Sequence, residues 1–158
     1  MPGPETTYRR ATLDDLPALA LLRWEMQVVW RDDAEAYAST REPYIATYCA
    51  AMREEMLAGR LRAWLAEADG APVAAVSLVT WLVPPSLAHS RRMRGQVSNV
   101  YTRPAYRRQG ISRTLMRLLL EHAREHEILR IILWSSEMGH SLYASLGFSA
   151  SEGMELYL

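Results

Sequence analysis

The chain has 158 residues, of which 49% are apolar and 23% are charged, the profile of one ordinary globular domain. Acidic and basic side chains number 18 each, so a formal net charge of zero gives no electrostatic reason to expect nucleic acid or an anionic membrane as a partner. The single Cys49 excludes an intramolecular disulfide.

The first part of the chain predicts a strand followed by two helices. Tyr8–Ala11 is a short strand candidate. Thr12, with Asp15 three residues later, resembles a capping box and marks the start of a helix whose apolar residues recur at helical spacing. A second helix is expected from about Glu42 to Ala58.

Beyond residue 60 the apolar pattern changes to that of strands. Leu61–Ala66 and Val73–Val83 flank the turn residues Asp69 and Gly70, which predicts a hairpin. A third strand is expected at Val97–Thr102.

The last part of the chain alternates helices and strands. Gly110 opens a strongly apolar helix, and Ile128–Trp134 has the continuous apolar pattern of a buried strand. We expect a short helix at Gly139–Leu146 and a last strand at Phe148–Leu158.

This order of elements implies one α/β domain with a mixed sheet that spans residues 1–158. No stretch reaches the roughly 18 uncharged apolar residues of a spanning helix. Met1–Glu5 lacks the charged start and apolar run of a secretory signal. We therefore expect a cytoplasmic protein.

The most informative stretch is a predicted strand-to-helix junction at residues 100–113, which reads VYTRPAYRRQGISR. A helix N-terminus presents unpaired N–H groups and a partial positive charge, so it attracts phosphates. Gly110 lets the backbone approach a ligand closely, and Arg107, Arg108 and Arg113 add positive charge. On these residues alone, phosphate binding and a solvated basic helix start are both consistent readings.

Two segments of the chain resemble motifs of the GNAT superfamily of N-acetyltransferases. Neither GxxxxGK nor GxGxxG is present, which disfavours a nucleoside triphosphatase and a dinucleotide dehydrogenase. The junction is similar to the acyl-coenzyme A loop of that superfamily, with Arg107, Gly110 and Ser112 at the pattern positions and serine replacing the usual final glycine or alanine. Downstream, the segment LYASLGF at Leu142–Phe148 resembles a second segment of the same superfamily.

The resemblance implies an α/β GNAT-type acyl-CoA transferase fold, in which a mixed central sheet with two splayed parallel strands is flanked by helices. Val97–Thr102 and Ile128–Trp134 would be the splayed pair, with the pantetheine of acetyl-CoA in the gap. By the same resemblance, the pantetheine would pair with the backbone of Val100, Tyr101 and Thr102. The pyrophosphate would bind main-chain N–H groups from Arg108 through Gln109, Gly110, Ile111 and Ser112 to Arg113, with Arg107 at the first position of the motif. Ser136 stands where the family commonly has an asparagine that contacts the coenzyme.

The implied chemistry is direct attack of an amine on the thioester of acetyl-CoA, without a metal. Tyr143 matches the family's usual proton donor to the leaving thiolate, and a phenol with a pKa of about 10 is protonated at neutral pH. Its alternative role is that of a half-buried anchor for the short helix. No carboxylate lies on the two expected splayed strands, so Glu137 is the nearest candidate base, ahead of Glu25 and His89, and a water relay is equally consistent.

The acceptor and the assembly are open at this point. A small amine, an amino acid, an antibiotic, a protein N-terminus or a lysine would all fit the same chemistry. A non-catalytic acyl-CoA-binding module, an acyltransferase with another acyl group or an oxygen acceptor, and a homodimer are also consistent with the sequence. Aromatic residues are dense where the family shapes its acceptor pocket: Trp24, Trp30, Tyr37, Tyr44 and Tyr48. We expect most of them in the core, and any that line the pocket would favour an amphipathic or aromatic amine over a polyanion.

His122 and His126 lie four residues apart on a predicted helix, a spacing at which two imidazoles can hold one metal ion. The sequence offers no third ligand at a suitable spacing. We therefore expect no metal site here and interpret the pair as a solvated helix flank.

Overall fold

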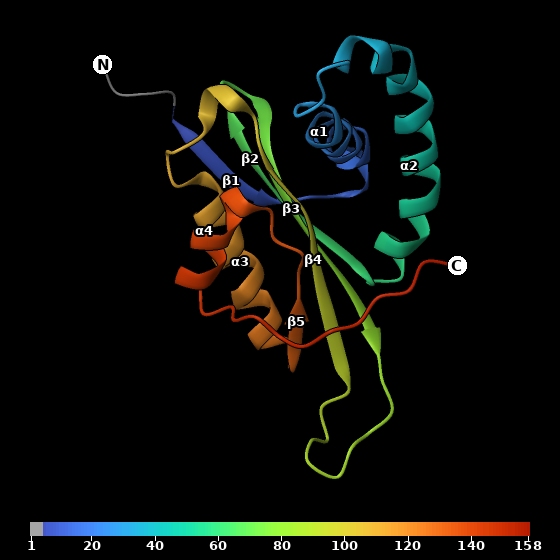
Figure 1. The fold of residues 1–158 in the computed structure, drawn as a ribbon, viewed down its shortest axis with the longest axis vertical. Coiled ribbons are helices and arrows are strands. Elements are labelled where there is room, and N and C mark those ends of the chain that lie inside the picture. Colours follow the sequence, from blue (N-terminus) through green and yellow to red (C-terminus); the bar gives the residue numbers. More distant parts are fainter. Residues whose placement is uncertain (1–4) are drawn as a thin grey trace.

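The computed structural model describes residues 5–158 (Figure 1). The absence of a secretory signal was predicted from Met1–Glu5. Residues 1–4 of that segment lie outside the described residues. The helices and strands in chain order are β1 (Thr6–Arg10), α1 (Leu16–Val28), α2 (Arg41–Leu57), β2 (Leu61–Ala68), β3 (Ala71–Leu82), β4 (Met93–Thr102), α3 (Ile111–Glu125), β5 (Arg130–Ile132) and α4 (His140–Ser145). Short 3-10 turns are η1 (Leu13–Asp15), η2 (Ala34–Thr40), η3 (Pro104–Tyr106) and η4 (Glu137–Gly139).

The strands form one sheet in the order β1-β2-β3-β4-β5. Strands β1 to β4 pair with one another in antiparallel order, and β5 pairs in parallel with β4. The predicted hairpin is present, because Asp69 and Gly70 take the positive φ angles that a tight turn between β2 and β3 requires. The predicted mixed sheet is thus confirmed.

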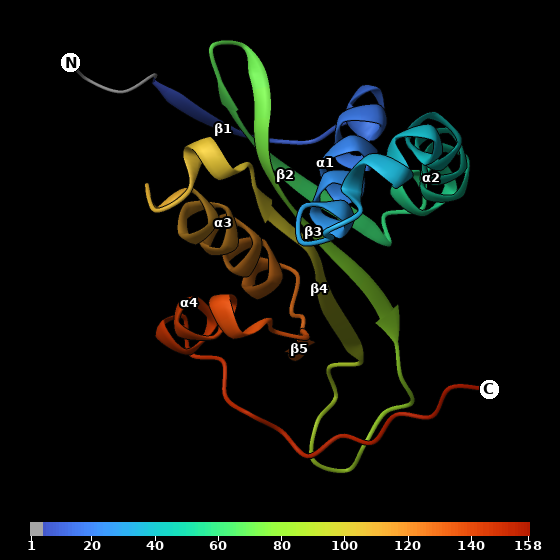
Figure 2. The same cartoon turned by 45° about the horizontal axis from the view of Figure 1, so that its top comes forward.

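Helices cover both faces of the sheet, with α1 and α2 on one face and α3 and α4 on the other (Figures 1 and 2). The inward stripe of α3 is fully buried at Leu115, Met116 and Leu119. On the opposite face, Leu19 and Leu22 of α1 pack against the sheet. Burial of these two apolar faces is the main stabilising contribution to the fold. Within residues 5–158, no helix is both long enough and apolar enough to cross a membrane.

Two predicted strands differ in the structure. The strand expected at Ile128–Trp134 is paired only over Arg130–Ile132, and Trp134 is 61% exposed. The strand expected at Phe148–Leu158 is wrong, because residues 149–158 form no helix or strand and are exposed. Alternating apolar residues define a face, but a strand forms only where a neighbouring edge satisfies its backbone groups. The three-residue β5 gives this segment very little edge on which to pair.

The predicted capping box fixes the start of the first helical segment. The backbone N–H of Thr12 donates to Asp15 Oδ2 at 2.8 Å, and Arg9 donates to both carboxylate oxygens of Asp15 at 2.7 and 2.8 Å. Arg9 also bonds Glu67 on β2 at 2.7 Å. The hydrogen bonds from Arg9, ahead of those from Thr12, lower the pKa of Asp15 from its usual 3.8 to about 2. Asp15 therefore ties the start of η1 to the sheet through Arg9.

Replacing Asp15 with asparagine is expected to lower the free energy of unfolding at pH 7 by about 1 kcal/mol, through loss of the cap and of a partly screened ion pair. Because the folded-state pKa is depressed, the contribution of Asp15 is present above about pH 4 and is lost as the pH falls toward about 2. Urea unfolding of the native protein and of Asp15→Asn between pH 2 and pH 7 measures this. The difference in unfolding free energy between them should shrink as the pH falls from about 4 to about 2. Asp14→Asn at the exposed neighbour is the control, and equal losses for the two variants would contradict the prediction.

Candidate active site

A gap between β4 and β5 is the first feature of the site. The two strands pair over only three residues each, ending at Gln96 on β4 and Ile132 on β5. Beyond Gln96, β4 continues along β3 alone. In the part of the chain that the structure describes, no strand pairs with the β5-facing edge of Val97–Thr102. The predicted parallel pairing of these two strands is therefore present, and it ends at Gln96, so backbone groups on this edge of β4 beyond Gln96 can bind a ligand.

A β-bulge lies in the same stretch of β4. From Ser98 to Tyr101 this strand advances three residues while β3 opposite it advances two, and Asn99 takes a left-handed φ of 55°. The buried Asn99 side chain donates from Nδ2 to the carbonyl of Leu19 on α1 at 3.4 Å. The bulge thus redirects the strand where it leaves β5 and holds it against α1. No role was predicted for Asn99, although asparagine is unfavourable within a strand and its position there was a usable signal.

The N-terminus of α3 lies beside the end of β4. Gly110 is the N-cap residue with a left-handed φ of 78°, and the first intrahelical bond runs from Thr114 N–H to the Gly110 carbonyl at 3.0 Å. The N–H groups of Ile111, Ser112 and Arg113 precede that bond and have no acceptor within the helix. An added Cβ at Gly110 would meet nothing within 4 Å, so the backbone angle, not space, requires glycine here.

Ser112 and Arg107 connect this helix start to the strand. The hydroxyls of Ser112 and Thr102 are 2.8 Å apart, so the serine that departs from the family pattern bonds the end of β4. Arg107 donates from Nε to the Thr102 carbonyl at 3.0 Å, and its guanidinium lies 4.9 Å from the centre of the Trp30 ring and 5.8 Å from that of Tyr101. Arg107 is therefore a bridge between β4 and the end of α1. Of the other predicted coenzyme-binding side chains, that of Ile111 is buried in the core, while those of Val100, Arg108, Gln109 and Arg113 are exposed wholly or in part.

Tyr143 lies half-buried on α4, packed on the α3 side of the sheet. Its ring meets that of Phe148 edge-on at 6.1 Å, and burial raises the pKa of its hydroxyl, so the phenol is protonated at neutral pH. A Cβ at Gly139 would come within 2.8 Å of the Tyr143 ring, so this close packing needs glycine. The packing of the ring fits the anchoring alternative for Tyr143, and its role as a proton donor stays a prediction.

The remaining predicted residues of this region are exposed. The Ser136 hydroxyl accepts the Gly139 N–H at 3.3 Å and caps η4. Glu137 follows in η4, and its carboxylate makes no hydrogen bond or ion pair with the residues that the structure describes. Ser136 is therefore used within the protein, while the Glu137 side chain is exposed to solvent.

The two lesser base candidates, Glu25 and His89, differ from Glu137 in their surroundings. Both carboxylate oxygens of Glu25 accept from Arg103, at 2.8 and 2.9 Å, and both side chains are half-buried. Glu25 is also the main cause of the raised pKa of Arg103. His89 lies exposed in the loop after β3, where its backbone bonds Ser86. A carboxylate held by a permanent cation and a distant loop histidine are both poor candidates for general base.

A cavity of about 490 Å³ lies between the end of α1 and the end of β4. Among the described residues 5–158, the charged ones that line it are Glu25 and Arg103, which bond each other. None of the five aromatic residues noted in the early helices lines this cavity, although Trp30 stacks on the adjacent Arg107. The other lining residues are apolar or aromatic: Val28, Val29, Ala34, Tyr101, Pro104, Ala105 and Tyr106.

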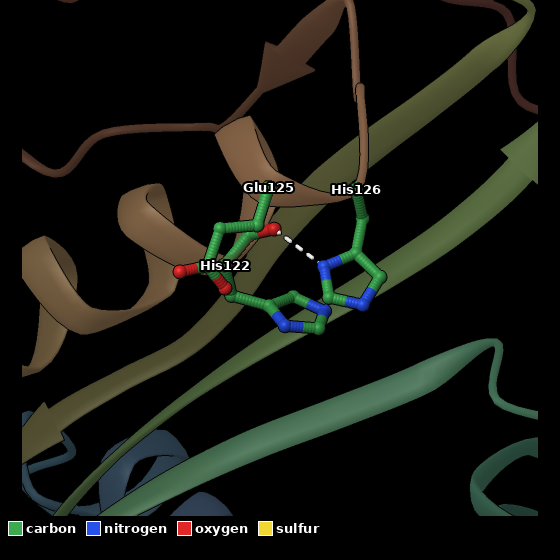
Figure 3. Close-up of side chains that lie close together, drawn as sticks. All are labelled: His122, Glu125 and His126. Atoms are coloured by element: carbon green, nitrogen blue, oxygen red, sulfur yellow. Dashed lines mark hydrogen bonds between the residues drawn. The ribbon is translucent and has the colours of Figure 1, made fainter.

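The histidine pair of α3 also differs from expectation. Figure 3 shows Glu125 beside His122 and His126, and one ligand atom from each of the three lies within 4.8 Å of the others. The prediction that no third ligand accompanies the pair was wrong. Residues three and four apart on a helix share a face, so Glu125 could have been identified from the sequence.

Known acetyltransferases match this chain in sequence. Residues 19–148 match the family model for the acetyltransferase (GNAT) family. A glucosamine 6-phosphate N-acetyltransferase of Trypanosoma brucei brucei is 32% identical over 77 residues, covering 49% of this chain and 52% of that protein, so the match spans about half of the relative's length.

Solved structures extend the likeness to the whole fold. A GCN5-related N-acetyltransferase from Ralstonia eutropha superposes with a TM-score of 0.80 and 28% identity, over 98% of this chain and 99% of that one. A predicted acetyltransferase with acetyl-CoA from Clostridium acetobutylicum also has a TM-score of 0.80, with 23% identity over 97% and 96% of the two chains. With the unpaired edge of β4 and the glycine-capped helix in place, this chain belongs to the GNAT family of acetyltransferases.

Proposed function

We propose that this protein is an acetyl-CoA-dependent N-acetyltransferase that transfers the acetyl group to a primary amine by direct attack. The observation that carries the proposal is the proximity of two sets of unpaired backbone groups, on the free edge of β4 and at the N-terminus of α3. The N–H groups that follow Gly110 would bind the pyrophosphate, since a helix N-terminus favours anions. Pantetheine would then pair with the backbone of Val100 and Tyr101 along the gap.

The residues of the gap can support each step of the reaction. Nitrogen attacks the thioester carbonyl, the C–N bond forms, and the resulting oxyanion collapses as the C–S bond breaks. A backbone N–H of Val100 or Tyr101 would stabilise the oxyanion, and one such donor typically contributes roughly 2.7–4 kcal/mol. Tyr143, kept protonated by burial, would give its proton to the thiolate.

The amine must lose a proton before or during attack. Glu25 is held by Arg103, while Glu137 is exposed and unpaired within the described residues. We therefore place deprotonation on a water relay, with Glu137 as the carboxylate that accepts the proton at the surface.

The cavity beside β4 favours an acceptor with an apolar or aromatic body. Tyr101 connects the two sites, because its backbone lies on the free edge of β4 and its side chain lines the cavity. A phosphorylated amino sugar, the acceptor in the name of the trypanosomal relative, fits this cavity poorly. Its dianion would face apolar walls and an arginine already paired with Glu25.

A non-catalytic acyl-CoA-binding module is the second candidate, favoured by the lack of a free carboxylate lining the cavity. Calorimetry with acetyl-CoA, followed by release of free thiol with a panel of amines, separates the two. We expect binding together with amine-dependent thiol release that is fastest for aromatic or alkyl amines. Binding without turnover across the panel would favour the module, and absence of binding would contradict both.

Gly110→Ala is expected to weaken acetyl-CoA binding about tenfold, because a left-handed backbone costs a non-glycine residue about 1–2 kcal/mol and the loop would shift to relieve it. Gly153→Ala is the matched control, since both glycines have open space at the added Cβ and only Gly110 has a positive φ. Calorimetry measures both affinities. Unchanged affinity in Gly110→Ala would remove the helix N-terminus from the binding site.

Tyr143→Phe is expected to lower kcat roughly 10- to 1,000-fold while acetyl-CoA affinity is retained, because the variant loses the proton donor and keeps the packed ring. The raised pKa of the tyrosine means that its ionisation should not reduce the rate until the pH exceeds about 10. Tyr157→Phe, in the exposed C-terminal segment, is the control. A kcat equal to that of the native protein would exclude Tyr143 from the mechanism.

Ala105→Trp is expected to raise the KM for aromatic amines at least about tenfold, because an indole would fill part of the acceptor cavity. The KM for acetyl-CoA should stay within about twofold. Ala150→Trp, which places the same side chain in the exposed C-terminal segment, should change neither constant. Steady-state kinetics tests this, and an unaltered amine KM in Ala105→Trp would place the acceptor elsewhere.

A further inference from the structure

The last turn of α3 brings together three groups that can bind a metal ion. His122, Glu125 and His126 follow the i, i+3, i+4 spacing of one helix face, and their ligand atoms lie within 4.8 Å of one another (Figure 3). The two imidazole rings are 3.9 Å apart between centres. These residues are separate from the gap between β4 and β5 and from the cavity beside α1.

The hydrogen bonding of His126 leaves one ring nitrogen free to bind a ligand. Its Nδ1 lies 2.9 Å from the backbone carbonyl of His122. A carbonyl oxygen can only accept, so Nδ1 carries the proton and donates, and Nε2 keeps its lone pair. Metal-binding histidines commonly donate their second ring nitrogen to a backbone carbonyl in this way, which fixes the tautomer and the ring orientation.

His122 is oriented by its packing. Its ring meets Trp64 of β2 edge-on, with 5.3 Å between centres, and is partly buried. This contact holds the ring on the helix face that it shares with His126.

The local charges both favour and oppose a cation. The C-terminal end of a helix carries a partial negative charge, and Glu125 adds a full one. Arg10 and Arg62, on the strands beneath His122, oppose it. The balance favours metals that form strong bonds to imidazole, such as zinc, over magnesium, which prefers oxygen ligands.

We propose that His122, Glu125 and His126 bind one divalent transition-metal ion of the zinc class, with water completing its coordination. The ion would join two successive turns at the end of α3. Directly after this turn, Ile128 N–H bonds the Ala123 carbonyl and Leu129 N–H bonds the Met93 carbonyl on β4. The metal would therefore stabilise the connection that starts β5, at the opposite end of α3 from Gly110, and take no part in acetyl transfer.

The test is calorimetric titration of the untagged, full-length protein with zinc chloride in a buffer that does not chelate metal. We expect one equivalent to bind the native protein at micromolar concentrations, with affinity reduced at least about tenfold in His126→Ala and less in Glu125→Gln. His140→Ala, an exposed histidine on α4, should bind zinc as the native protein does. Magnesium chloride should give no heat of binding.

Two further measurements distinguish loss of binding from loss of folding. Circular dichroism in EDTA should show the same fold and nearly the same unfolding temperature for His126→Ala as for the native protein, since the side chain is exposed. Zinc should raise the unfolding temperature of the native protein and of His140→Ala, but not of His126→Ala. No zinc binding to the native protein, or equal affinity in His126→Ala, would overturn the proposal.

Discussion

The unpaired edge of β4 is the constraint on which the rest of the site depends. After Gln96 and Ile132 the parallel ladder ends, and the following residues of β4 are bonded on one side only. Backbone N–H and carbonyl groups that lack a strand partner must bond water or a ligand, because leaving them unpaired costs about 1–3 kcal/mol each. The gap between the strands is therefore a preformed recognition surface made of main chain. A ligand that pairs there replaces hydrogen bonds that the sheet does not make.

Side chains around the gap mostly hold the backbone in place. Ser112 bonds Thr102, Arg107 joins the same strand end to Trp30, and Asn99 ties the bulge to α1. Glu25 and Arg103 close the adjacent wall as an ion pair. These contacts position the two sets of unpaired backbone groups relative to each other. They also explain why the serine that departs from the family pattern is compatible with the fold.

Helix α3 has one of the two proposed binding sites at each of its ends. Its N-terminus, at Gly110, carries free N–H groups and a partial positive charge that suit a diphosphate. Its C-terminal turn, where His122, Glu125 and His126 converge, has the opposite polarity and suits a cation. Fifteen residues at 1.5 Å each separate these ends by about 22 Å. An anion at one end and a metal at the other would both stabilise the helix dipole without direct contact.

Local patterns determined the helices, the β2–β3 hairpin, the capping box at Thr12 and the glycine-capped junction, because each depends on residues a few positions apart. The family followed from two such segments, and the mixed sheet followed from the order of the predicted elements. Only the tertiary structure decided that β5 is three residues long, that residues 149–158 form no strand, and that Arg103 holds Glu25. Strand length and ion pairing depend on what distant segments place alongside, and Glu25 and Arg103 are 78 residues apart. The periodicity of a single segment carries no information about that partner.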